Sequence, residues 1–274
     1  MRWRSASVII LLCWALVALS APWLPLQPYD IALENILQSP EPQLWLGADD
    51  LGRPVLDRLL MGARTSFWVA CWVVSLSLLI GTLFGAVAAY RGGIWDRALV
   101  LVIDIFMAFP GILLAIALAG LLGPGIDNLV FALTLVGWVG FARLARAQVL
   151  SVKQRDHVLA AQALGTRPWR IVTRHLLPLI SAPLVVEATF GIAGVVVAES
   201  GLSFLGLGVQ PPEASWGSMI RDGVRYLLVA PHLVIAPGAA LFIVVMSVNL
   251  LGDRLRDWLD VRTVRSTRLT GGAV

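Results

Sequence analysis

The sequence predicts an all-α integral membrane protein with six transmembrane helices. Of its 274 residues, 58% are hydrophobic and only 14% are charged, and the mean hydropathy is +0.82. Soluble globular domains are considerably more polar than this. In addition, apolar runs near the roughly 20 residues that a helix needs to cross a bilayer alternate with short polar segments in which arginines cluster.

The same composition excludes two classes of function. Lysine occurs once, at Lys153, and no Gly-x-x-x-x-Gly-Lys-Ser/Thr sequence is present, so no phosphate-cradling loop is expected. Any ATP that drives this protein must therefore be bound by another chain, and we expect no cofactor on this one. The net charge of +4 comes from arginines between apolar runs, which indicates membrane topology rather than a nucleic-acid partner.

The first predicted elements are a span over residues 1–26 and an extracytoplasmic segment over residues 27–64. Ala18-Leu19-Ser20 is also compatible with a cleavable signal peptide, which would leave the orientation of the remaining chain unchanged. The excess of acidic residues in 27–64 favours the outer side of the membrane. Within it, Asp49-Asp50-x-Gly52 predicts a turn, because the further carboxylates of a calcium loop are missing.

The other five spans are expected within residues 65–254, at about 66–90, 98–122, 126–142, 183–204 and 235–251. A basic tail, 255–274, follows the last span. With this topology sixteen Lys and Arg residues lie on one side of the membrane and five on the other. Because positive charge accumulates on the cytoplasmic side, both termini are expected there. Trp216 and Tyr226, which precede the sixth span, are expected at the membrane interface.

Four residues within the spans are candidates for a pathway or for helix packing. Pro110 should kink the third span, because proline removes a backbone donor. Asp104 is costly in lipid; we expect it to pair with an arginine, with a substrate contact as the alternative. Glu187 and Glu199 in the fifth span lie roughly 120° apart around a helix, so they should not form a relay along one face.

The polar segment 157–178 between the fourth and fifth spans is the most distinctive part of the chain. Small residues lead up to Gly165, which is a plausible helix cap. Thr166 can cap a second helix, Pro168 is tolerated in its first turn, and Trp169 and Ile171 supply apolar anchors. The pattern predicts two cytoplasmic helices separated by a tight break. On physical grounds alone, a simple connector between two spans is an equal alternative.

Three motifs resemble those of permease subunits in bacterial binding-protein-dependent ABC importers. Ala160-Ala161 with Gly165 and Leu176-Leu177-Pro178 is similar to the Glu-Ala-Ala…Gly…Leu-Pro loop of that family. The other two motifs resemble the dipeptide, oligopeptide and nickel branch: they are Leu46 to Arg53 with Gly62 to Ser66, and Ala198 to Pro212 with Ser215-Trp216-Gly217. The resemblance extends from about Leu46 to Asp260 and implies a type I importer permease fold.

In that family the loop between the fourth and fifth spans forms coupling helices that dock on a cytoplasmic ATPase. The resemblance assigns this role here to Leu159, Ala160, Ala161, Ala163, Leu164, Gly165, Trp169 and Pro178. One departure is Leu159, which stands where the family usually has glutamate. Any contact of that carboxylate with the ATPase must be absent or replaced.

The resemblance also implies the partners and the cargo. The expected partners are a second homologous permease, two cytoplasmic ATPase subunits, an extracytoplasmic substrate-binding protein and the lipid of the bacterial inner membrane. Di- and oligopeptides are the expected substrates, with nickel or a metal chelate as the alternative.

The residues point to no enzymatic activity and no metal site. No serine has a base at a readable spacing, and the three histidines, His157, His175 and His232, lie at no metal-ligand spacing. A secondary carrier driven by an ion gradient is the remaining alternative. Such a carrier should show inverted repeats and mid-membrane ionisable residues, whereas the carboxylates of this chain lie mainly near the ends of its spans.

Overall fold

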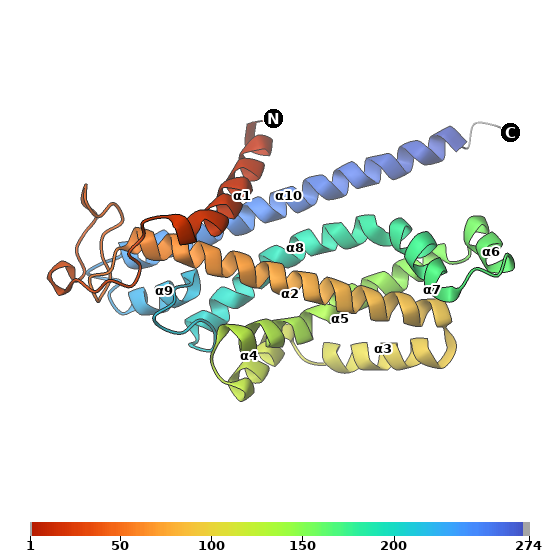
Figure 1. The fold of residues 1–274 in the computed structure, drawn as a ribbon, viewed down its shortest axis with the longest axis horizontal. Coiled ribbons are helices and arrows are strands. Elements are labelled where there is room, and N and C mark those ends of the chain that lie inside the picture. Colours follow the sequence, from red (N-terminus) through yellow and green to blue (C-terminus); the bar gives the residue numbers. More distant parts are fainter. Residues whose placement is uncertain (1, 271–274) are drawn as a thin grey trace. The chain divides into compact units, whose positions relative to one another are not determined.

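The computed structural model describes residues 2–270, with side chains placed for residues 6–259; residues 271–274 of the expected tail lie outside this range. The regular elements are helices, which Figure 1 colours along the chain. Five are long and apolar enough to cross a membrane, and a bent pair provides a sixth if its two members form one span. The predicted all-α class is confirmed, and the predicted six spans hold with the bent pair as one span.

The five long helices are α1 (Arg2–Ser20), α2 (Val55–Arg91), α5 (Ile126–Val152), α8 (Leu177–Phe204) and α10 (His232–Thr270). Two short 3₁₀ helices, η1 (Ala21–Trp23) and η2 (Leu33–Asn35), lie between α1 and α2. α2 begins at Val55 rather than near residue 66, so residues 55–64 of the predicted outer segment are helical. Asp57 in its first turn favours this early start, because a carboxylate complements the positive end of the helix dipole.

The third predicted span is broken rather than merely kinked. It consists of α3 (Gly93–Met107) and α4 (Gly111–Leu122), which meet at an angle of 83°. Pro110 lies in the break, as predicted, but the bend is larger than the expected kink. Proline lacks a donor and also disfavours helical geometry at the preceding residue, Phe109, so neither residue can continue α3.

The described chain divides into two compact units, and the boundaries fall inside α2, α5, α8 and α10 and directly after the first residue of α4. The first unit comprises residues 1–73, 112–133 and 192–248, and its core includes a tryptophan pair. Trp14 stacks on Trp216 at 6.2 Å between ring centroids, and their indole N–H groups donate to the carbonyls of Ala63 and Leu59. Trp216 is only 2% exposed, so its predicted place at the membrane interface is wrong. Its polar atom has a backbone partner inside the protein and needs no water.

The second unit comprises residues 74–111, 134–191 and 249–274, and within it α2 and α5 approach closely. A Cβ atom on Gly85 would meet the carbonyl oxygen of Ala142, and one on Gly81 would lie 2.6 Å from Cβ of Phe141. Glycines four residues apart let two membrane helices bring their backbones together. α3 adds Leu99 and Ile103 to the core of this unit.

Candidate functional site

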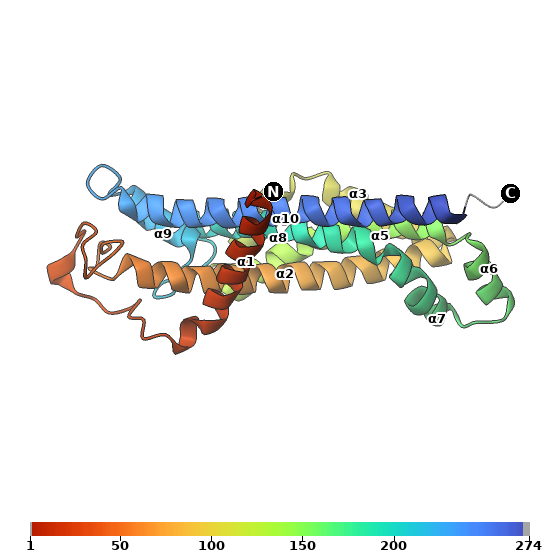
Figure 2. The same cartoon turned by 90° about the horizontal axis from the view of Figure 1, so that it is seen from above.

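The segment 157–178 forms two short helices joined by a tight break, as predicted (Figures 1 and 2). The first, α6 (Asp156–Ala163), ends in a Schellman motif at Gly165, which has φ +71°. The N–H of Gly165 donates to the carbonyl of Gln162 at 2.9 Å, and the N–H of Thr166 donates to that of Ala161 at 3.1 Å. Glycine enters this left-handed conformation without a steric penalty. The predicted glycine cap is confirmed.

α6 has one buried face and one exposed face. Val158 is fully buried and Ala161 is only 7% exposed, whereas Leu164 just beyond the helix is 86% exposed. The residues to which the resemblance assigns the docking role are therefore divided: Ala161 packs inside the chain, whereas Leu159, Ala160, Ala163 and Leu164 are exposed.

The second helix, α7 (Pro168–Arg170), differs from its prediction in two respects. Its N-cap is Arg167, with no side-chain cap, rather than Thr166; Pro168 does occupy the first turn, as expected. Of the two predicted anchors, Ile171 is buried but Trp169 is 58% exposed, with the guanidinium of Arg170 5.5 Å from its ring. A helix of a single turn directs only part of its side chains inward, so the second anchor remains at the surface.

A π-helical turn, η3 (Ile171–Leu176), connects α7 to α8. The N–H of Leu177 donates to the carbonyl of Val172, five residues earlier, which is the hydrogen bond that defines a π-helix. The hydroxyl of Thr173 donates to the carbonyl of Trp169 at 2.9 Å. η3 contacts both α6 and α7. The segment 157–178 is thus tied directly to the start of α8.

Two polar contacts hold the helices that lead into this segment. Arg146 of α5 forms a bidentate ion pair with Asp96 of α3, at 2.6 and 2.8 Å. Lys153, just after α5, donates to the carbonyl of Ala89 at 3.0 Å and so satisfies a carbonyl in the last turn of α2. Neither contact was predicted. The single lysine of the sequence, Lys153, stands out in the composition, but its presence does not indicate which group it would bind.

The pathway candidates of the second unit are exposed. Asp104 is exposed and takes part in no ion pair among the residues whose side chains the structure describes, so its predicted pairing with an arginine within the chain is wrong. The carboxylate of α3 that does form an ion pair is Asp96, which lies in the first turn of α3 and binds Arg146. Glu187 is also exposed, with Oε1 3.8 Å from the place that a Cβ on Gly140 would occupy.

Glu199, in the first unit, is fully buried and accepts hydrogen bonds from serine hydroxyl groups. Its Oε1 accepts from Ser203 at 2.8 Å, and its Oε2 accepts from Ser66 at 2.9 Å and from Ser200 at 3.4 Å. The side chain thereby links α8 to α2. The sequence placed the serines in motifs but did not indicate that they converge on this carboxyl group.

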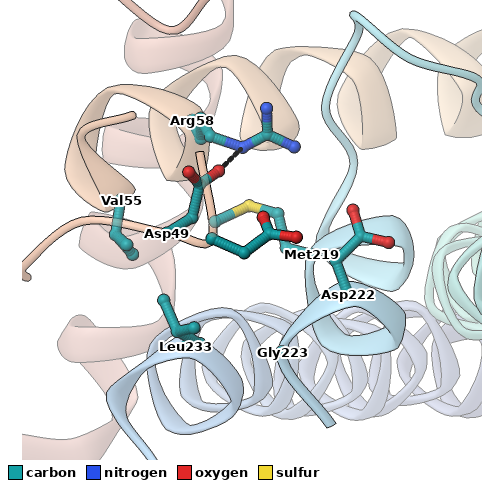
Figure 3. A pocket seen from close by; sticks show the side chains of 8 residues that line it. Asp49, Val55, Arg58, Met219, Asp222, Gly223 and Leu233 are labelled. Carbon is teal, nitrogen blue, oxygen red and sulfur yellow. Dashed lines mark ion pairs between the residues drawn. The ribbon is translucent and has the colours of Figure 1, made fainter. Parts of the chain in front are cut away.

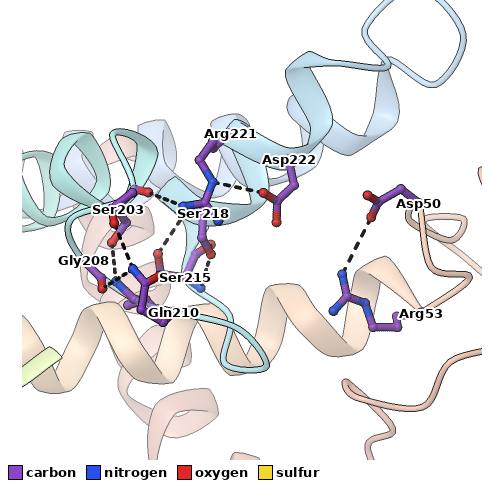
Figure 4. A network of polar contacts seen from close by, with 11 residues as sticks. Asp50, Arg53, Ser203, Gly208, Gln210, Ser215, Ser218, Arg221 and Asp222 are labelled. Carbon is purple, nitrogen blue, oxygen red and sulfur yellow. Dashed lines mark hydrogen bonds and ion pairs between the residues drawn. The ribbon is translucent and has the colours of Figure 1, made fainter. Parts of the chain in front are cut away.

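The same motif also builds the connection from α8 to α9 (Trp216–Val224), part of which is drawn in Figure 4. Ser215 and Ser218 form a reciprocal capping box at the start of α9. The amide of Gln210 donates to the carbonyls of Gly206 and Gly208, both at 3.0 Å. These contacts explain why short polar residues and glycines alternate in this stretch.

Asp49 forms the predicted turn. Its Oδ1 accepts from the backbone N–H groups of Leu51 and Arg53, and its Oδ2 accepts from Arg53 Nε at 2.8 Å and pairs with Arg58 Nε at 3.3 Å (Figure 3). Burial of the Asp50 carboxyl group raises its pKa, and the negative charge of the neighbouring Asp49 raises it further. Among the residues that the structure describes, no group of three or more His, Cys, Asp or Glu side chains is placed to hold a metal ion.

Comparison with known proteins gives consistent results. Residues 81–265 match the family described as binding-protein-dependent transport system inner membrane component. The nickel transport system permease protein NikC of Escherichia coli K12 is 41% identical over 266 residues, or 96% of each chain. The dipeptide transport system permease protein DppC of Alkalihalophilus pseudofirmus is 39% identical over 254 residues, covering 92% of this chain and 84% of that one.

A third relative and a solved structure complete the comparison. The glutathione transport system permease protein GsiD of Escherichia coli O6:K15:H31 is 39% identical over 264 residues, covering 95% of this chain and 86% of that one. An inward-facing structure of the MetNI methionine ABC transporter matches the fold with a TM-score of 0.55 at 22% identity, over 79% of this chain and 98% of that one. The chain therefore belongs to the family of binding-protein-dependent transport system inner membrane components, as a permease subunit of an ABC importer in the dipeptide, nickel and glutathione branch.

Proposed function

We propose that this chain is the membrane subunit through which an ATP-driven importer takes up di- and oligopeptides. An extracytoplasmic binding protein delivers the substrate, a second homologous permease completes the passage, and two cytoplasmic ATPase subunits bind the ATP. Residues 1–26 supply an additional span, 27–64 lie outside, 65–254 form the permease domain, and 255–274 are a cytoplasmic tail. Both termini lie in the cytoplasm.

The observation that carries the ATPase contact is the exposed apolar surface of α6. Leu164, 86% exposed, stands at a helix end that the Gly165 motif fixes in position. Leu159, Ala160 and Ala163 continue this surface. Exposed apolar groups that a rigid motif holds outside the spans favour burial against a partner protein. With Leu159 in place of the usual glutamate, this contact is apolar where relatives of the family would use a carboxylate.

Arginine substitutions on this surface test the docking proposal. Leu164→Arg and Ala160→Arg would bury an unpaired charge against the ATPase, which typically costs about 3–5 kcal/mol, so docking should weaken by roughly a hundredfold or more. The measurement is co-purification of the ATPase with tagged permease, together with ATP hydrolysis stimulated by the binding protein. Ala161→Arg is not a clean test, because Ala161 is buried inside the chain.

Gln154→Arg is the matched control, since residue 154 is exposed and lies before α6. It should assemble and transport normally, because exposed surface changes usually stay within about 0.5 kcal/mol. All variants should insert in the membrane at normal abundance. If Leu164→Arg binds the ATPase and transports like the unmodified protein, α6 is not the coupling element.

Peptide is proposed as cargo because permeases named for dipeptide and for glutathione, itself a small peptide, both align over more than nine-tenths of this chain. A nickel importer is the second candidate, since the nickel permease matches 96% of both chains. Uptake of a labelled dipeptide and of radioactive nickel should be compared in proteoliposomes holding the complete complex and its binding protein. Dipeptide uptake that unlabelled oligopeptides inhibit is expected. Nickel uptake without peptide uptake would reverse the assignment.

A further inference from the structure

The π turn η3 is a feature that docking of α6 on an ATPase does not by itself require. The run from Pro168 to Phe204 is one helical stretch long enough to span a membrane, yet six residues near its start, Ile171–Leu176, widen into a π turn. π turns inside α-helices are rare and occur frequently at functional sites.

Pro178 supplies one cause of this turn. In an α-helix the residue at position 178 would donate its N–H to the carbonyl of Arg174, but proline has no N–H and its ring collides with that carbonyl. A π turn immediately before the proline relieves the collision, because hydrogen bonding passes to a partner five residues back. The bond from Leu177 to Val172 is of this kind.

Proline alone does not explain the turn, because Pro183 lies inside α8 without producing one. The second cause is packing against α6, which contacts η3. In a π turn, residues five apart lie near the same face; Ile171 and Leu176 are five apart, and both are buried. The buried side chains of α6 are Val158 and Ala161. η3 and the inner face of α6 thus both consist of buried apolar side chains, and the two elements are in contact.

We propose that Pro178 is a positioning residue for transport: it imposes the π turn against which α6 packs, so that α6 and α8 move as one body. When the ATPase displaces α6, the membrane-spanning part of α8 then moves with it, because no flexible loop between them absorbs the displacement. This inference rests on the proposed docking of α6. It adds the element that converts docking into movement of a span.

The first experiment compares Pro178→Ala with Pro183→Ala in the complete importer with its binding protein. Pro178→Ala restores the backbone N–H donor at position 178 and lets the π turn tighten toward an α-helix. This change removes the surface against which α6 packs. In the complexes that retain the ATPase, uptake per ATP hydrolysed should fall about threefold or more. Pro183→Ala makes the same chemical change in the same helix away from η3, and its coupling ratio should equal that of the unmodified protein.

The second experiment measures the geometry directly. Spin labels are attached to cysteines at Gln162 and Val185, both exposed and neither on the proposed docking surface, after replacement of Cys13 and Cys71 by serine. The unmodified complex should give a single narrow distance between the labels, before and after nucleotide addition. Pro178→Ala should broaden or shift it. Val158→Ala removes apolar volume from the buried face of α6 and leaves Pro178 in place, so it should also broaden or shift the distance. If Pro178→Ala fails to assemble, the distance in Val158→Ala tests the proposal instead.

The outcomes separate this inference from the proposed function. If docking persists in Leu164→Arg, the role of α6 itself is refuted. If docking is sensitive to Leu164→Arg but Pro178→Ala keeps either the normal coupling ratio or the narrow distance, the ATPase contact stands and the relay through η3 is refuted.

Discussion

Glu199 is a carboxyl group that the described part of the chain surrounds with hydroxyl groups rather than with a cation. It is fully buried, and its contacts are Ser66, Ser200 and Ser203. A buried polar group that lacks its partners costs considerably more than the same group fully hydrogen-bonded. The serines and the carboxyl group therefore depend on one another, and together they fix α8 to α2 within the first unit.

Removal of this acceptor should destabilise the protein. Glu199→Leu leaves buried hydroxyl groups without their partner, so we expect a loss of about 2 kcal/mol or more in unfolding free energy. Glu199→Gln retains the shape and one acceptor oxygen and should lose less. Thermal unfolding of the detergent-solubilised protein, followed by tryptophan fluorescence, checks both. A Leu variant as stable as the unmodified protein would contradict a structural role for this network.

At the scale of residues, the sequence predicted what depends on local backbone geometry. The glycine cap at Gly165, the first-turn proline at Pro168 and the turn at Asp49 all follow from short-range rules, and all are found. The placements of Asp104 and Trp216 were wrong, because each depends on which side chain or carbonyl another helix brings near. Ala160 and Ala161 are chemically identical, and only tertiary packing makes one exposed and the other buried.

At the scale of elements, the crossing of α2 and α5 in the second unit depends on the absence of side chains. Gly81 and Gly85 face the backbone of α5 at Trp138 and Ala142, where a Cβ has no room. Apart from Cβ of Phe141 beside Gly81, the neighbouring atoms are backbone atoms, and none of them can rotate away as the end of a side chain would. Close approach of this kind supplies the packing that stabilises helix pairs in lipid.

Gly85→Ala should therefore be destabilising. Its added carbon would lie 3.1 Å from the carbonyl carbon of Ala142 and closer still to the oxygen, and overpacking of this kind costs about 1–3 kcal/mol. The control is Gly120→Ala in α4, where nothing lies within 4 Å. Alanine favours a helix by up to about 1 kcal/mol over glycine, so the control should be neutral or stabilising. The unfolding midpoint should fall for Gly85→Ala and stay the same or rise for Gly120→Ala, and equal losses in the two variants would refute the close crossing.

The existence of the long helices followed from hydropathy, whereas their interruptions did not. Apolar runs identify spans because lipid requires continuous hydrogen-bonded backbone, and α1, α2, α5, α8 and α10 all coincide with such runs. The 83° break between α3 and α4 and the π turn before α8 both occur next to prolines that the sequence shows. The angle by which a helix bends at a proline depends on the elements that pack beside it, and the sequence alone does not show which elements these are.

At the scale of the whole molecule, each compact unit is assembled from segments far apart in the sequence. The first unit joins α1 to α9, as the stacking of Trp14 on Trp216 shows. The second joins the end of α2 to α3 and α5 through Lys153 and the pair of Asp96 with Arg146. Partition of a linear sequence into consecutive segments, such as 27–64 and 65–254, describes topology and says little about which parts pack together.

The proposed orientation is tested by cysteine labelling in intact cells, in a protein whose Cys13 and Cys71 are replaced by serine. Single cysteines at Ser39 and Leu228 are exposed and lie in segments assigned to the outside, so an impermeant thiol reagent should label both. Ser215 in the same outer region would be a poor probe, because it is fully buried and caps α9. A cysteine at Gln154, exposed just before α6, should react only after the membrane is opened, since sixteen of the twenty-one Lys and Arg residues lie on that side under the proposed topology. Labelling of residue 154 in intact cells would place α6 outside, where no ATPase subunit could reach it.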